Sequence, residues 1–152
     1  MDSKSQRAPD REECAPNARG DSARDELSRT PTETVHSMVR LFNEGDLDAA
    51  QALLSPRVVN HAAPIGTDSG WRGWRAFWES VRRGYPDFHA SIEQTCEAGD
   101  IVATQYTMRG THTDEFLGSA ATGRRFEARA MDIMRVRDGQ IVEHWGVSEP
   151  WG

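Results

Sequence analysis

Cysteine is scarce in this 152-residue chain, in which Cys14 and Cys96 are the only two. Two cysteines so far apart do not indicate a disulfide framework, and they lack the ligand spacing of a zinc site. No apolar run is long enough to span a bilayer, and the N-terminal residues lack the apolar core of a signal peptide. These absences favour a reducing compartment, so we expect a cytoplasmic protein that does not cross a membrane.

Concentrated positive charge is also missing. Lys and Arg total 18 against 24 Asp and Glu, which gives a net charge of −6, and the arginines are scattered. This balance argues against nucleic acids and anionic membranes as partners. The chain has neither a phosphate-binding glycine loop nor a His-Glu-x-x-His pattern, so we expect no nucleotide chemistry and no metal site.

Two regions of different composition divide the chain. Residues 1–29 carry mixed charges, and their only large apolar side chains are Met1 and Leu27. Such a segment buries too little apolar surface to offset the entropy of ordering it, so we predict a disordered tail. Residues 30–152 are then a single folded domain.

The first part of that domain has the pattern of helices. Thr30-Pro31-Thr32-Glu33 combines a capping threonine with a proline at the first helical position and a glutamate three residues after the cap. Gly45 ends this helix, and Asp46 caps a second one that we extend through Leu54. A short strand follows over residues 58–61. A third helix over residues 71–85 carries an aromatic stripe and stops at Pro86.

The apolar period changes to two after residue 87, which is typical of strands. We predict strands that begin near Phe88, Ile101, Phe126 and Ile141, with Cys96 in the core. Helices followed by antiparallel strands indicate an α+β domain in which the helices pack on one face of a curved, mainly antiparallel sheet.

Asp132 is a carboxylate on an otherwise apolar strand face. Every second residue of this strand points to the same side, and the side that carries Asp132 consists of Phe126, Ala128, Ala130, Asp132, Met134 and Val136. A carboxylate in such surroundings must find hydrogen bonds or remain protonated. Groups of this kind cluster at functional sites, although structural networks also contain them.

Several segments resemble the SnoaL-like polyketide cyclase family, within the nuclear transport factor 2-like superfamily. They are FNEGDLDAAQALLSPRVVNH, WRGWRAFWESVRRGYPDFH, RGTHTDEFLGSAATGRR and MDIMRVRDGQIVEHWGV, and together they cover most of residues 33–148. The resemblance implies a cone-shaped barrel with a deep apolar pocket, a homodimer, and no metal or organic cofactor.

The resemblance also suggests catalytic residues. Family members commonly have an aspartate after the His-Trp pair, whereas this chain has Gly146 after His144 and Trp145. Asp132 then becomes the best remaining acid/base, with His144 beside it if the strands keep ordinary register. His61 is a third candidate, at the mouth of the pocket. His144 could equally be a core histidine, and His61 an edge residue bonded to a loop.

Other side chains are candidates for binding an apolar, carbonyl-containing small molecule, because such pockets combine aromatic walls with few polar anchors. They are Trp74, Trp78, Asn60, Tyr106, Met134 and Trp145. Core packing is the commoner role for tryptophans such as Trp74 and Trp78, and the role of Trp145 is likewise ambiguous.

Two functional hypotheses follow. The first is a polyketide or ester cyclase, or an isomerase, that removes a proton beside a carbonyl and stabilises the enolate. The second is a non-catalytic binding or accessory protein that kept the pocket, a hypothesis supported by the glycine at position 146.

Overall fold

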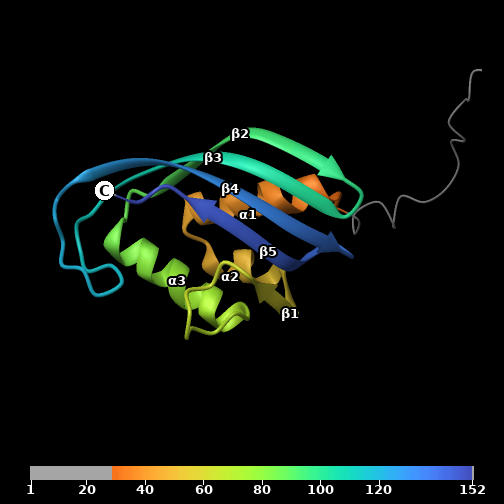
Figure 1. Ribbon diagram of the computed structural model, residues 1–152, viewed down its shortest axis with the longest axis horizontal. Coiled ribbons are helices and arrows are strands. Elements are labelled where there is room, and N and C mark those ends of the chain that lie inside the picture. Colours follow the sequence, from red (N-terminus) through yellow and green to blue (C-terminus); the bar gives the residue numbers. More distant parts are fainter. Residues whose placement is uncertain (1–28, 152) are drawn as a thin grey trace, which may run out of the picture.

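The structure of the protein is a computed structural model that describes residues 29–151. It contains three helices and five strands, and the curved sheet lies over the helices (Figure 1). The predicted α+β class is therefore confirmed. The predicted disordered tail, residues 1–29, lies almost entirely outside the described residues. No helix of the described part is long and apolar enough to cross a membrane.

The first two helices begin where the sequence predicts, and the first also ends there. Helix α1, Pro31–Glu44, starts with a complete capping box, in which Thr30 and Glu33 each accept the other's backbone N–H. Gly45 ends it in the left-handed conformation at φ 76°, which glycine adopts without strain. Asp46 caps α2, Leu47–Ala52, by accepting from the N–H of Ala49.

The prediction that α2 extends through Leu54 is wrong. That residue begins β1, Leu54–Asn60, and is paired with Ile141. Leu53 and Leu54 are buried, so their apolar character fits a helix or a strand equally well. The predicted strand at residues 58–61 is the end of a longer strand.

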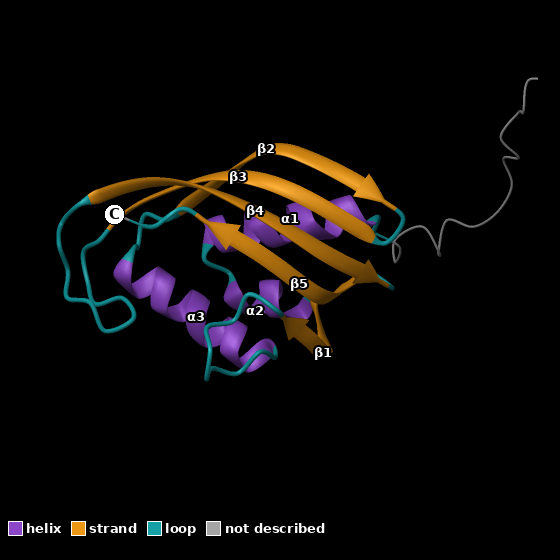
Figure 2. Ribbon diagram, viewed as in Figure 1, coloured by secondary structure: helices purple, strands orange, loops and turns teal. Residues whose placement is uncertain are grey.

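Helix α3, Trp71–Gly84, lies beneath the sheet beside α2 (Figure 2). The strands are β2, His89–Ala98; β3, Ile101–Thr111; β4, Arg125–Arg137; and β5, Gln140–Ser148. Their order in the sheet is β1-β5-β4-β3-β2. All neighbours are antiparallel except β1 and β5, which run parallel.

The prediction that Cys96 lies in the core is wrong, because this residue is exposed. The register of β2 against β3 shifts between Ile92 and Gln94. Such a bulge reverses the alternation of faces, so Cys96 turns outward although Ile92 is paired with the inward Tyr106.

The hydrophobic core lies on the concave side of the sheet. One cluster joins α1, α2 and β1 to the middle of the sheet, and a second joins the end of α3 to β3 and β4. Residues of both clusters line a pocket between the helices and the sheet.

Candidate active site

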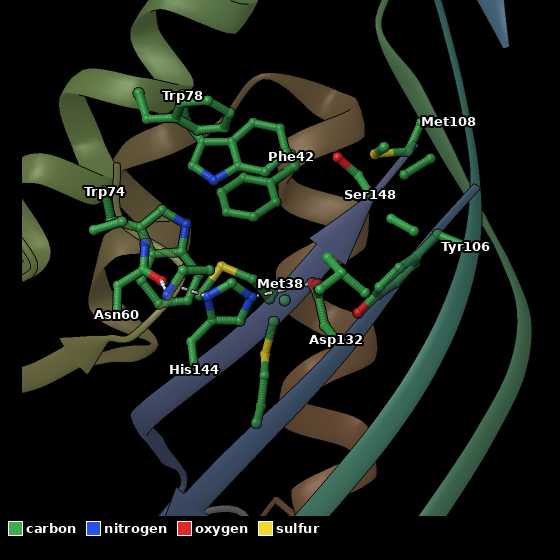
Figure 3. Close-up of a pocket in the computed structure, with 18 of the residues that line it drawn as sticks. Met38, Phe42, Asn60, Trp74, Trp78, Tyr106, Met108, Asp132, His144 and Ser148 are labelled. Atoms are coloured by element: carbon green, nitrogen blue, oxygen red, sulfur yellow. Dashed lines mark hydrogen bonds and ion pairs between the residues drawn. The ribbon is translucent and has the colours of Figure 1, made fainter. Parts of the chain in front are cut away.

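A cavity of about 300 Å³ lies between the concave face of the sheet and helices α1 and α3. Most of its lining is apolar, including Met38, Phe42 and Met108, and its polar groups are few. Figure 3 shows Asp132 and Tyr106 on the sheet side of the cavity, opposite Trp74 and Trp78 on α3. An apolar cavity with a few converging polar groups is the usual form of a small-molecule site.

Asp132 and His144 face each other inside this cavity. Asp132 is paired with Gly146, and Met134 with His144, so both polar side chains share the inward face of β4 and β5. His144 Nε2 lies 3.3 Å from Asp132 Oδ2, within ion-pair distance. The angle is not that of a hydrogen bond, and Nε2 has no hydrogen-bond partner in the described part of the chain. This buried nitrogen is therefore held close to Asp132 without a hydrogen bond to it.

Asn60 determines which nitrogen of His144 carries a proton. The parallel pairing of β1 with β5 places Asn60 beside His144. Asn60 Oδ1 accepts from the N–H of Ala62 at 3.0 Å and lies 2.8 Å from His144 Nδ1. An amide oxygen can only accept, so Nδ1 donates to it. A neutral ring in this tautomer has its lone pair on Nε2, which faces the Asp132 carboxyl group.

The absence of a side chain at Gly146 leaves room for the carboxyl group of Asp132. A Cβ at position 146 would lie 2.5 Å from Asp132 Oδ1 and 3.0 Å from His144 Nε2. Contacts that short would force the carboxylate or the imidazole to move. The missing side chain on β5 and the acid on β4 therefore depend on each other sterically.

Tyr106 adds a hydroxyl beside this pair. The residue is 4 % exposed, and its Oη has no hydrogen-bond partner among residues 29–151. Burial raises the pKa of Tyr106 well above its usual value and the charge of Asp132 raises it further, while the nearby Thr104 hydroxyl acts weakly in the opposite direction. A buried hydroxyl without a partner is costly, so it is a ready donor for a ligand oxygen.

Aromatic side chains form the helix side of the cavity. The ring of Trp74 stacks on His144 with centroids 5.0 Å apart, and Trp78 stacks on Phe42 at 3.9 Å. Met134 lines the cavity from β4. Of the residues proposed from the sequence, the structure therefore brings Asp132, His144, Asn60, Tyr106, Trp74, Trp78 and Met134 to one cavity.

The structure does not place His61 or Trp145 in the cavity lining, which corrects two of our assignments. Trp145 is paired with Ile133 and follows the inward His144, so alternation turns it to the outer face of the sheet. His61 lies just beyond β1 and stacks on Trp145 with centroids 4.7 Å apart, while its Nε2 is 3.3 Å from Glu143. Because both side chains lie on the outer side of the sheet, neither reaches Asp132.

Sequence reasoning missed several lining residues, among them Phe88, Met108 and Trp151. Phe88 and Met108 have the alternation of inward strand positions, which would have sufficed to select them. Trp151 follows the last strand and has no periodic signal. No group of three or more His, Cys, Asp or Glu within residues 29–151 could hold a metal ion.

Comparison with known proteins agrees with this architecture. A sequence profile of the SnoaL-like polyketide cyclase family matches residues 32–151. The chain is 26 % identical over 136 residues to aklanonic acid methyl ester cyclase DnrD of Streptomyces peucetius, covering 80 % of this chain and 93 % of that protein. It is 28 % identical over 110 residues to nogalonic acid methyl ester cyclase of Streptomyces nogalater, covering 70 % and 81 %.

The fold gives the same result. Wild-type IdmH from Streptomyces antibioticus superposes with a TM-score of 0.70 at 38 % sequence identity, covering 80 % of this chain and 93 % of that chain. Family profile and fold agree over nearly the whole described chain. The chain therefore belongs to the SnoaL-like polyketide cyclase family.

Proposed function

We propose that this protein catalyses the ring closure of an apolar polyketide ester by proton transfer beside a carbonyl, with Asp132 as the acid/base. The single observation that carries the proposal is the Asp132–His144 pair in a mostly apolar cavity, with His144 oriented by Asn60. Family membership and the cyclase relatives support the reaction class.

The first step breaks a C–H bond next to the substrate carbonyl. The Asp132 carboxylate takes the proton, and the electron pair forms an enolate whose oxygen accepts a hydrogen bond from Tyr106 Oη. Protonated His144 balances the negative charge, and its Nδ1–H stays bonded to Asn60. Tyr106 suits this role because its raised pKa keeps the hydroxyl protonated.

The second step forms the new ring. The enolate carbon attacks a second carbonyl of the same molecule, making a C–C bond and an alkoxide. The alkoxide then takes one proton, from Asp132 directly or through His144 Nε2. No atom is gained or lost overall, so the reaction is an isomerisation by aldol addition. Positioning both carbonyls in the cavity supplies much of the rate, since proton transfer alone contributes a factor of about 10²–10⁴.

Replacement of the acid tests this function. Aklanonic and nogalonic acid methyl esters, chosen from the names of the relatives, are suitable trial substrates, and ring closure is followed by absorbance. We expect Asp132→Asn to lower turnover by about 10²–10⁴-fold while the ester still binds, because Asn keeps the volume but not the proton exchange.

Unchanged turnover in the Asp132→Asn variant would remove Asp132 from the mechanism. Binding of the esters to the wild type without any ring closure would favour the alternative, a binding or accessory protein. His61→Ala is a suitable control, because this residue lies outside the cavity lining and its loss should leave turnover unchanged.

We also propose that the protein works as a cytoplasmic homodimer that associates through the outer face of the sheet. Met131, Ile133 and Val147 are exposed there by 59 %, 45 % and 72 %, next to Trp145. We call these four residues the outer apolar patch. Arg135 and Glu143, which form an ion pair at 3.2 Å, lie beside this patch. A two-fold contact would bury the same apolar surface of both subunits.

A further inference from the structure

The cavity extends along β4 away from the acid/base pair. Trp151 lines it together with Phe77 and Phe88. The Trp151 ring lies nearly parallel to that of Phe126, at 8° with centroids 4.9 Å apart. Phe126 precedes Asp132 by six residues on β4, which is about 20 Å of extended strand.

The contacts of helix α3 also distinguish the two ends of the cavity. Trp74, in its first turns, stacks on His144, whereas Tyr85 at its end meets the edge of Trp151 at 5.5 Å. The cavity therefore has a polar end at His144 and an aromatic end at Trp151.

Several aromatic rings fix the orientation of Trp151. Phe116 lies parallel to it at 4° and 5.4 Å, and Phe88 lies at 25° and 5.7 Å. Phe77 meets it at 63° and 6.3 Å. These rings come from α3, the segment before β2 and the loop before β4, so one indole joins parts of the fold that are distant in sequence.

An ion pair holds the segment that carries Trp151. Glu149 Oε1 accepts from Arg129 Nη2 at 2.7 Å and from Nε at 3.0 Å, and Oε2 accepts from the Arg129 backbone N–H at 2.9 Å. The N–H of Glu149 donates to the carbonyl of Arg129 at 2.9 Å. These bonds fix the chain to β4 just before Trp151, whose indole lines the cavity.

We propose that Trp151 is a specificity-determining residue: its indole is the end wall that limits how far a flat aromatic substrate can extend from Asp132, and the Arg129–Glu149 pair holds that wall in place. The inference rests on the proposed function in one respect: it takes the Asp132 end of the cavity as the place where the reacting carbonyl lies. A face of fused rings suits this end, because aromatic surfaces stack favourably on Trp and Phe.

Binding of a graded series of probes tests the wall. Hydroxyquinones with two, three and four fused rings are titrated against the full chain, and their dissociation constants are compared. We expect Trp151→Ala to raise the affinity for the four-ring probe relative to the two-ring probe by about tenfold, equivalent to about 1.4 kcal/mol. Trp151→Phe should give a smaller shift in the same direction, and Glu149→Gln a shift smaller than that of Trp151→Ala.

Trp145→Ala is the matched control, because it removes an indole from the outer face and should leave the affinity ratio unchanged. An unchanged ratio in folded Trp151→Ala and Trp151→Phe variants would overturn the inference, and so would failure of every probe to bind the wild type. Asp132→Asn separates the two proposals, since it should lower turnover by about 10²–10⁴-fold and keep the wild-type affinity ratio. A shifted ratio in Trp151→Ala with full turnover in Asp132→Asn would retain the wall and reject the proposed mechanism.

Discussion

Gly146 is a position where an added methyl group should matter. Because a Cβ there would lie 2.5 Å from Asp132 Oδ1, Gly146→Ala must displace the carboxylate from His144. We expect turnover to fall towards that of Asp132→Asn. The free energy of unfolding should fall by only about 1 kcal/mol, the low end for overpacking, because the displaced carboxyl group can move into the cavity. Kinetics and urea denaturation measure the two effects.

A double variant identifies the cause. In Asp132→Ala/Gly146→Ala the carboxylate is gone, so the second alanine should cost much less stability than it does alone. If the cost of Gly146→Ala were the same in both backgrounds, the steric dependence between the two positions would be wrong.

Tyr106 should donate a hydrogen bond throughout the neutral and mildly alkaline range. Its pKa is raised above the ordinary value of about 10, so its hydroxyl keeps the proton as pH rises towards that value. We expect Tyr106→Phe to lower kcat by about 10²-fold, as for the loss of one donor to an oxyanion. The remaining activity should have the same dependence on pH between about 8 and 10 as the wild type. A wild-type alkaline limb in this range that the Phe variant lacks would show instead that Tyr106 ionises there.

At the scale of elements, alternation and capping residues predicted most of the fold. The period of two placed Asp132, Met134 and His144 on one face, and capping residues gave the bounds of α1. Register between distant segments was not predictable, because it depends on packing and not on local pattern. The parallel β1–β5 pairing that brings Asn60 to His144 and the bulge that turns Cys96 outward are both of this kind. The expectation that His61 and Trp145 contribute to the site differs from the structure for a related reason. Both are adjacent in sequence to inward residues, and such neighbours point outward.

Asp87 links the start of β2 to the end of β3. Its Oδ1 accepts from the N–H of Thr111 and its Oδ2 from the Thr111 hydroxyl, both at 2.7 Å. The hydroxyl, and then the N–H, lower the pKa of Asp87, so its contribution to stability is present above about pH 4 and is lost as pH falls through the folded-state pKa. Asp87→Asn should therefore lower the free energy of unfolding at pH 7 by about 1 kcal/mol, a modest value because the group is exposed.

Urea denaturation at pH 7 and pH 3 measures this difference, which should shrink at the lower pH. Asp114→Asn serves as the control, since that carboxylate accepts only from the N–H of the next residue among the described residues. A difference between Asp87→Asn and the wild type that is independent of pH would contradict the assigned ionisation.

At the scale of the whole molecule, the outer apolar patch should determine the oligomeric state. Ile133→Glu places a charge in the middle of the exposed apolar surface, so we expect the dimer to dissociate, because burying an unpaired carboxylate is costly. Light scattering after gel filtration measures the mass. Arg57→Glu, an exposed change on β1, should leave the dimer intact, and a monomeric wild type would reject this contact.

The hydrogen bond from His144 to Asn60 joins residues 84 positions apart. Contacts of such long sequence separation form slowly, because closing the intervening chain costs entropy before any contact compensates for it. The two antiparallel hairpins, β2–β3 and β4–β5, are local and can form earlier. The edge pairing of β1 with β5 then orients the imidazole, so during refolding the recovery of ring-closing activity should lag behind the recovery of sheet structure.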